Sequence, residues 1–168
     1  MEIIDKTFKQ SPKSFIIQSV LAVITVAIIL YFVEVLTHAA IVAALGASAF
    51  VVFAMPRSIT ARSRSLIGGH IVGLLSGTVC HYVFLAGPLG KFINGAEFAV
   101  IFIYALAVGL AIFLMVITNT EHPPAAGTAL GIVTHEWTYQ TIIFIVVFAV
   151  SLAIVKVLLR RYLKNLCT

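Results

Sequence analysis

Residues 118–131, TNTEHPPAAGTALG, stand between two long apolar runs and combine residue types that neither a helix interior nor a bilayer favours. They include the carboxylate of Glu121, the imidazole of His122 and the adjacent prolines Pro123 and Pro124. The prolines remove two backbone donors and push His122, the residue before them, away from the α conformation. The small residues that follow let another segment or a solute come close to the backbone. We therefore expect this stretch to line an internal cavity.

The composition predicts a membrane protein. Of the 168 residues, 61% are hydrophobic and only 10% are charged, whereas a soluble domain has about 25% charged residues. A helix that spans a bilayer needs about 20 apolar residues, and charge-free runs of about this length or longer lie at 14–33, 65–90, 98–120 and 137–155. The runs 35–56 and 122–135 are rich in small residues and are predicted to be short broken or re-entrant segments. The expected fold is thus a single all-α integral membrane domain over residues 1–168, with four long transmembrane helices and two short segments.

The basic residues predict how the chain crosses the membrane. If all six segments cross, ten of the eleven Lys and Arg residues lie on one side, which the positive-inside rule assigns to the cytoplasm. Those ten are Lys6, Lys9, Lys13, Arg57, Arg62, Arg64, Lys156, Arg160, Arg161 and Lys164, and Lys91 alone lies outside. Both termini are then cytoplasmic, and we expect a bacterial inner membrane.

The order of the segments suggests an internal repeat. The halves 14–90 and 97–160 each read as long helix, short segment, long helix, and they enter the membrane from opposite sides. This is the pattern of an inverted-topology repeat, in which interrupted segments at matching positions indicate a binding site at the midplane. A re-entrant loop at 122–135 is the main alternative.

Two further clusters of small and polar residues accompany the His122 stretch. One is Gly46-Ala47-Ser48-Ala49, and the other is Gly68-Gly69-His70, which continues into Gly73 and Gly77. Glycines 69, 73 and 77 lie four residues apart, so close helix packing is an alternative explanation for them.

These three clusters resemble the HPP family of integral membrane proteins. That family is named for a His-Pro-Pro motif, here His122-Pro123-Pro124, and its members also carry a Gly-Ala-Ser-Ala segment and a Gly-Gly-His segment in this order. Many relatives have Arg-Asn where this chain has Arg64-Ser65, and the family is described with four transmembrane segments. Plant members are described as nitrite carriers of the chloroplast envelope. The resemblance implies nitrite, or a similar small anion, as the substrate.

The chemistry of the residues suits an anion. If residues 46–48 and 127–128 begin half-helices, their free N–H groups and positive dipole ends point into the cavity. Protonated His70 and His122 could donate to the anion, and a proton could travel with it. The predicted substrate-binding or pore residues are Gly46, Ala47, Ser48, Gly69, His70, His122, Pro123, Pro124, Gly127 and Thr128, and a possible proton or anion relay comprises Glu34, Arg64 and Glu121. His38, His81 and His135 are expected at membrane interfaces.

Other function classes remain as alternatives or are not supported by the sequence. No Gly-Lys-Ser/Thr phosphate loop is present, so transport is expected to be passive or driven by ions or protons. Catalytic acid–base pairs, a nucleophile triad, metal-ligand spacings and nucleic-acid-binding patches are absent, so we expect no enzyme, no cofactor and no nucleic-acid partner. The alternatives are a structural subunit or a redox or metal-binding subunit of a membrane complex. Closely packed small residues favour a homo-oligomer in the lipid bilayer.

Overall fold

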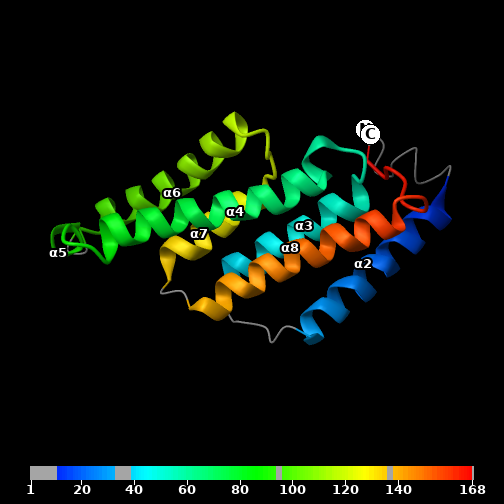
Figure 1. The fold of residues 1–168 in the computed structure, drawn as a ribbon, viewed down its shortest axis with the longest axis horizontal. Helices are drawn as coiled ribbons and strands as arrows, with labels where there is room; N and C mark the ends of the chain where they lie inside the picture. The colour runs from blue at the N-terminus through cyan, green and yellow to red at the C-terminus, as the bar shows by residue number, and fades with distance from the viewer. Residues whose placement is uncertain (1–10, 33–38, 94–95, 136–137, 168) are drawn as a thin grey trace, which may run out of the picture.

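The computed structural model describes residues 11–32, 39–93, 96–135 and 138–167, which form a bundle of helices (Figure 1). In chain order these are α2 (Pro12–Phe32), α3 (Ala39–Ala54), α4 (Ser63–Cys80), α5 (Gly90–Ile93), α6 (Glu97–Ile117), α7 (Pro124–Thr134) and α8 (Tyr139–Leu159). A 3-10 turn, η1 (Ile59–Ala61), precedes α4, and a π-helical turn, η2 (His81–Leu85), follows it. The described part of the chain is all-helical, as predicted.

Three helices in the described residues are long and apolar enough to cross a membrane. They are Ser63–Leu85, Glu97–Ile117 and Tyr139–Leu159, and they coincide with the long helices predicted at 65–90, 98–120 and 137–155. The fourth long helix, predicted at 14–33, coincides with α2. Within α2, the range Pro12–Thr25 is a shorter apolar helix. A fourth span therefore stays a prediction.

The structure corrects one part of the expectation for the two short segments, the break at residues 46–48. Helix α3 runs without interruption from Ala39 to Ala54, so residues 46–48 lie in its middle and begin no half-helix. Helix α7 is one helix of 11 residues, about 16 Å long, so it is shorter than the roughly 30 Å hydrocarbon core, and whether the segment 122–135 crosses or re-enters stays open. Both helices are rich in alanine, the strongest helix former, and α7 begins at the prolines because proline is favoured in a first turn.

Helix α7 lies in the centre of the bundle and runs parallel to α4. It also packs against α3 and α6. A Cβ added to Gly69 would lie 2.6 Å from Cβ of His122, one at Gly73 would overlap the carbonyl oxygen of Ala125, and one at Gly77 would lie 2.6 Å from the carbonyl oxygen of Ala129. From Gly69 to Gly77 the contact residue in or just before α7 also moves toward the C-terminus, so the two helices run in the same direction. Close packing therefore explains these three glycines, as the alternative interpretation predicted.

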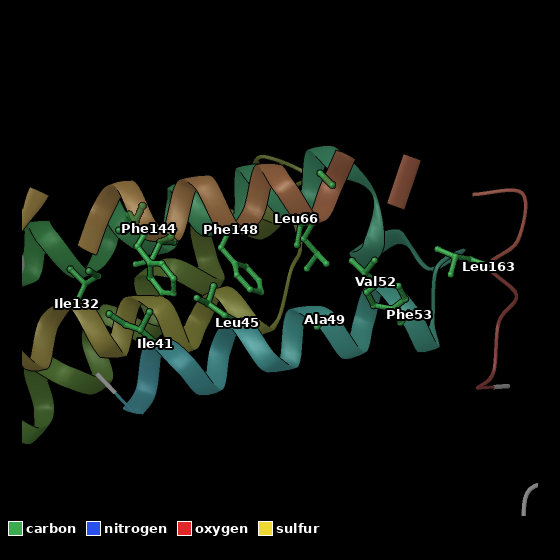
Figure 2. Packing of buried hydrophobic residues seen from close by; sticks show 14 residues of the cluster. Ile41, Leu45, Ala49, Val52, Phe53, Leu66, Ile132, Phe144, Phe148 and Leu163 are labelled. Carbon is green, nitrogen blue, oxygen red and sulfur yellow. The ribbon is translucent and has the colours of Figure 1, made fainter. Parts of the chain in front are cut away.

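The hydrophobic core fills the space between α3 and α8. Figure 2 shows Phe144 and Phe148 of α8 extending toward Ile41 and Leu45 of α3, and all four side chains are buried. Leu66 of α4 belongs to the same cluster, which extends to other residues of α3 and α8 and to Ile132 and Leu163. This core holds α3 in place, and with it Ser48.

The ends of α3 and α8 meet the starts of α2 and α4 at one end of the bundle (Figure 1). The side chain of Gln18 in α2 donates to the carbonyl oxygens of Phe53 and Lys164 and accepts from the backbone N–H of Lys164. The Arg64 guanidinium donates to the carbonyl oxygen of Thr118 at 2.7 Å. We call this the basic end, because its described residues include Arg57, Arg62, Arg64, Lys156, Arg160, Arg161 and Lys164. Lys91 lies in α5, at the opposite end in Figure 1.

Candidate functional site

Two histidines that are 52 residues apart in the sequence meet inside the bundle. His70 lies in α4 and is 1% exposed, and His122 lies just before α7 and is fully buried. Their ring centroids are 5.1 Å apart and the rings are tilted by 60°. The sequence placed both in the same candidate site, and the structure brings them together.

A single hydroxyl joins the two imidazoles. Ser48 Oγ, from the middle of α3, lies 2.9 Å from His70 Nε2 and 2.9 Å from His122 Nε2. The outer nitrogens also have partners: His70 Nδ1 lies 2.8 Å from Thr128 Oγ1 of α7, and His122 Nδ1 lies 2.8 Å from the carbonyl oxygen of Thr60. We call these groups the histidine network. It connects α3, α4 and α7 through buried polar side chains.

The partners determine which ring nitrogens carry hydrogens. The carbonyl of Thr60 can only accept, so His122 Nδ1 carries a hydrogen, and in the neutral ring its Nε2 accepts. Ser48 then donates its hydroxyl hydrogen to His122 Nε2 and accepts from His70 Nε2–H, and Thr128 donates to His70 Nδ1. Both imidazoles are neutral in this arrangement, and all four ring nitrogens are paired.

The same geometry accommodates one additional proton. If His122 Nε2 is protonated, Ser48 Oγ accepts from both imidazoles and turns its own hydrogen to the carbonyl oxygen of Ala44, which is 2.9 Å away. No ring nitrogen loses its partner, and only one hydroxyl rotates. The histidine network can therefore hold or release one proton without moving a helix.

Local sequence explains how His122 reaches this position. Asn119 has a positive φ of 52°, which asparagine tolerates better than most residues, and it ends α6. The backbone N–H of Thr120 donates to Met115 O at 2.9 Å and that of Asn119 donates to Val116 O at 3.3 Å. These two bonds are the Schellman pattern of a helix end. The chain then has three residues before Pro123 and Pro124 begin α7, and this tight connection directs His122 inward.

A pocket of about 290 Å³ lies between α6 and the start of α7. Its wall is apolar except at Glu121 and His122, and it is completed by Ile112, Met115, Val116, Pro123 and Ala126. Because His122 has no exposed surface, the pocket stops at this residue and does not open onto the histidine network. Glu121 is half-buried in the wall.

The other predicted site residues are more dispersed. Gly46 and Ala47 are exposed on α3 and point away from the network, and a Cβ on Gly46 would meet nothing within 4 Å. Gly127 faces Ala44 of α3, where a Cβ would come within 3.1 Å. Arg64 is exposed and bound to Thr118 O, at the end of α6. Glu34 and His38 lie outside the described residues.

The two remaining histidines are near helix ends. His81 follows α4, is half-buried, and its Nδ1 lies 3.2 Å from the carbonyl oxygen of Val133. His135 follows α7, is exposed, and its Nδ1 lies 2.8 Å from Thr134 Oγ1. Neither belongs to the histidine network.

Sequence reasoning missed two members of this region. The carbonyl oxygen of Thr60 is a backbone group, so no side-chain pattern could indicate that it would bind His122. Asn119 stood inside the quoted stretch, and an asparagine directly after a long apolar run was the available signal for a helix end. In the described part of the chain, no group of three or more His, Cys, Asp or Glu residues is arranged to hold a metal ion.

The fold and the site define the class: a small, all-helical integral membrane protein with a hydrogen-bonded pair of histidines buried between its helices. A family described as "HPP, transmembrane region" matches residues 7–166, and the chain belongs to this family. A protein from Dictyostelium discoideum, described only as a transmembrane protein, is 33% identical over 126 residues. The match covers 74% of this chain and 41% of the relative, so the chain spans about two fifths of the relative's length. No solved structure matches the chain significantly.

Proposed function

We propose that this protein transports a small anion across the membrane, with nitrite as the first candidate, and that a proton accompanies the anion. The observation that carries this proposal is the histidine network, a buried group that can take up one proton at constant geometry. The pocket between α6 and α7 ends at His122, so a small anion in this pocket would lie next to one residue of the network. The family resemblance favours nitrite among small anions.

The energetics of burial support coupling between proton and anion. A lone positive charge on a buried imidazole costs several kcal/mol unless an opposite charge compensates it. An anion that arrives beside His122 supplies that charge, so each of the two species lowers the cost of the other. With no anion bound, the neutral arrangement of the histidine network is the stable one. Transport is therefore expected to be electroneutral for a monovalent anion.

The arrangement of helices supports a two-fold inverted repeat of the halves 14–90 and 97–160. Helix α2 packs on α3 and α8, and α6 packs on α7 and α4. These are equivalent neighbours if α2, α3 and α4 correspond to α6, α7 and α8. Ser48 of α3 and Thr128 of α7 then lie on corresponding helices, and they lie 2.9 Å and 2.8 Å from opposite nitrogens of His70. In such repeats the substrate site lies where the halves meet.

Glu121 and Arg64, two of the predicted relay residues, lie close to His122 or to the connection that precedes it. Glu121 lines the pocket next to His122, where its carboxylate can accept or release a proton. Arg64 holds the carbonyl oxygen of Thr118, so it positions the connection that carries His122. We also propose that both termini are cytoplasmic, that the membrane is a bacterial inner membrane, and that copies associate through the exposed apolar face of α6.

The test is uptake of nitrite into proteoliposomes that contain the purified protein, with and without an inward proton gradient. Nitrate, formate and chloride are measured alongside. We expect saturable nitrite uptake that a proton gradient accelerates. Uptake no faster than into empty liposomes, from protein that elutes as a single folded species, would reject nitrite transport and favour a structural subunit.

Two histidine variants connect the flux to the site. His122→Gln keeps a donor for Thr60 O and an acceptor for Ser48 but cannot be protonated, so we expect folded protein without proton-coupled uptake. His122→Ala should lose uptake as well. The matched control is His135→Ala, because His135 is exposed and outside the network, and its uptake should equal that of the wild type. Wild-type uptake by both His122 variants would reject the role of the network.

A further inference from the structure

A second pocket, of about 260 Å³, lies at the basic end between the start of α4 and the end of α8. Three of its lining residues are cations, namely Arg57, Lys156 and Arg160. Ser63 adds a hydroxyl, and Pro56, Val157 and Leu163 complete the wall. None of the described lining residues is acidic, so the positive charges of this pocket have no negative partner within its own wall.

The surroundings add to the positive potential. The Lys156 ammonium donates to the carbonyl oxygen of Ala61, which holds it at the pocket, and it also experiences the positive charge of Arg62. Ser63 is the first residue of α4, and Arg62 at the N-cap gives the first turn no side-chain hydrogen bond. The positive end of an 18-residue helix is thus directed at the same place.

An apolar groove continues from this pocket along the outside of the bundle. The groove has a volume of about 280 Å³ and lies between α4 and α8. Ser63 and Val157 line both the pocket and the groove, and the groove continues with Ile67, Val150, Ala153, Ile154 and Leu158. Ile154, Val157 and Leu158 are more than half exposed. The cationic pocket therefore adjoins an exposed apolar groove on the outside of the bundle.

We propose that this composite site binds an anionic phospholipid. The phosphate of the headgroup would interact with Arg57, Lys156 and Arg160, and one acyl chain would lie in the groove between α4 and α8. Charge complementarity selects an anion, and the adjoining apolar groove selects a phosphate that carries a hydrocarbon chain over free phosphate. Basic pockets between transmembrane helices are a known way to bind anionic headgroups. The site shares no residue with the histidine network, so it does not depend on the transport proposal.

The test is a lipid titration of the full-length protein in detergent, read by native mass spectrometry and by thermal unfolding. The probes are phosphatidylglycerol, phosphatidylcholine and inorganic phosphate. We expect phosphatidylglycerol to bind and to raise the unfolding temperature, phosphatidylcholine to bind more weakly, and phosphate at the same concentration to displace little lipid. Equal binding of the two lipids would overturn the proposed selectivity for anions. Displacement of the lipid by equimolar phosphate would overturn the lipid assignment in favour of free phosphate.

Variants locate the binding. Arg57→Gln combined with Arg160→Gln should weaken phosphatidylglycerol binding by about fivefold for each cation removed. Val157→Trp fills the junction of pocket and groove and should weaken it further, and the exposed side chain makes this change compatible with folding. Arg161→Gln, an exposed neighbour outside the pocket wall, is the control and should bind like the wild type. Unchanged affinity in the double variant would overturn the site.

Discussion

Ser48 has three hydrogen-bond partners around one oxygen: Ala44 O and the Nε2 atoms of His70 and His122. A serine inside a helix commonly bonds to the carbonyl four residues earlier. Here that bond is one of two positions for the hydroxyl hydrogen, and the other is His122 Nε2. The rotation of one hydroxyl therefore distinguishes the neutral network from the network with an added proton.

Substitution Ser48→Ala tests this residue directly. The methyl group leaves both Nε2 atoms without a partner in a buried place, and each unsatisfied group costs about 1–3 kcal/mol. We expect a clear decrease in the free energy of unfolding, measured by chemical or thermal denaturation in detergent, and loss of proton-coupled uptake. The result that contradicts the network is a Ser48→Ala protein as stable and as active as the wild type.

Ser76 provides the matched comparison in α4. It is 1% exposed, and its hydroxyl has no hydrogen-bond partner among the residues that the structure describes. Because Ser76→Ala removes a buried polar group that makes no bond, the free energy of unfolding should stay within about 0.5 kcal/mol of the wild type or increase. Denaturation curves of the two variants, recorded side by side, separate the loss of a network from the loss of a serine.

At the scale of elements, the interface between α4 and α7 depends on backbone-to-backbone approach. Gly73 lies against the carbonyl of Ala125 and beside Thr128, where an added Cβ would overlap the backbone. This contact sets the distance between His70 and Thr128, which lie on the same two helices. The geometry of the candidate site therefore depends on the close helix packing that glycine allows, although glycine itself has no functional side chain.

Gly73→Ala should separate α4 from α7. We expect a loss of about 1–3 kcal/mol in stability, because the clash is with backbone and cannot be relieved by a rotamer change, and a loss of nitrite uptake with it. Gly109→Ala is the control, since a Cβ there meets nothing within 4 Å and alanine favours the helix by up to about 1 kcal/mol. A Gly73→Ala protein that melts at or above the temperature of the control would contradict this packing.

The sequence was sufficient to predict most elements but not their local geometry. Charged residues bounded the apolar runs, and so the long helices at 63–85, 97–117 and 139–159 were expected nearly where they occur. The unbroken course of α3 was missed, because glycine and serine at 46–48 read as a break, whereas the surrounding alanines favour a continuous helix. His70, His122, Ser48 and Thr128 were predicted as site residues, but their mutual hydrogen bonds depend on helix packing, which has no local sequence signal.

At the scale of the whole molecule, one buried amide connects α2 to the other elements of the basic end. Gln18 is 1% exposed and connects α2 to the end of α3 and to the segment after α8 through Phe53 and Lys164. In the sequence it is one polar residue in an apolar run, and one partner is 146 positions away, so its role could not be foreseen. These long-range hydrogen bonds of Gln18 determine how α2 is attached to the bundle.

Gln18→Ala should loosen this attachment. The change leaves two carbonyl oxygens and one N–H without their partner, and we expect a loss of about 2–3 kcal/mol, measured by thermal unfolding in detergent. Limited proteolysis should also cut the segment after α8 faster. Gln140→Ala, at an exposed position in the first turn of α8, should leave both measurements unchanged. Equal behaviour of the two variants would show that α2 is held by packing alone.

The direction of the helices gives a final prediction about the orientation of the protein. Ser63–Leu85 has 23 residues and is about 35 Å long, more than the roughly 30 Å of the hydrocarbon core. Arg57 before it and Lys91 after it must then face opposite compartments. By the positive-inside rule we predict that the basic end faces the cytoplasm. In a Cys167→Ser background, where Cys80 is buried, a membrane-impermeant thiol reagent should label Arg57→Cys only in inside-out vesicles and Lys91→Cys only in right-side-out vesicles. Labelling of both from one side would mean that α4 does not cross, and the reverse pattern would invert the assigned orientation.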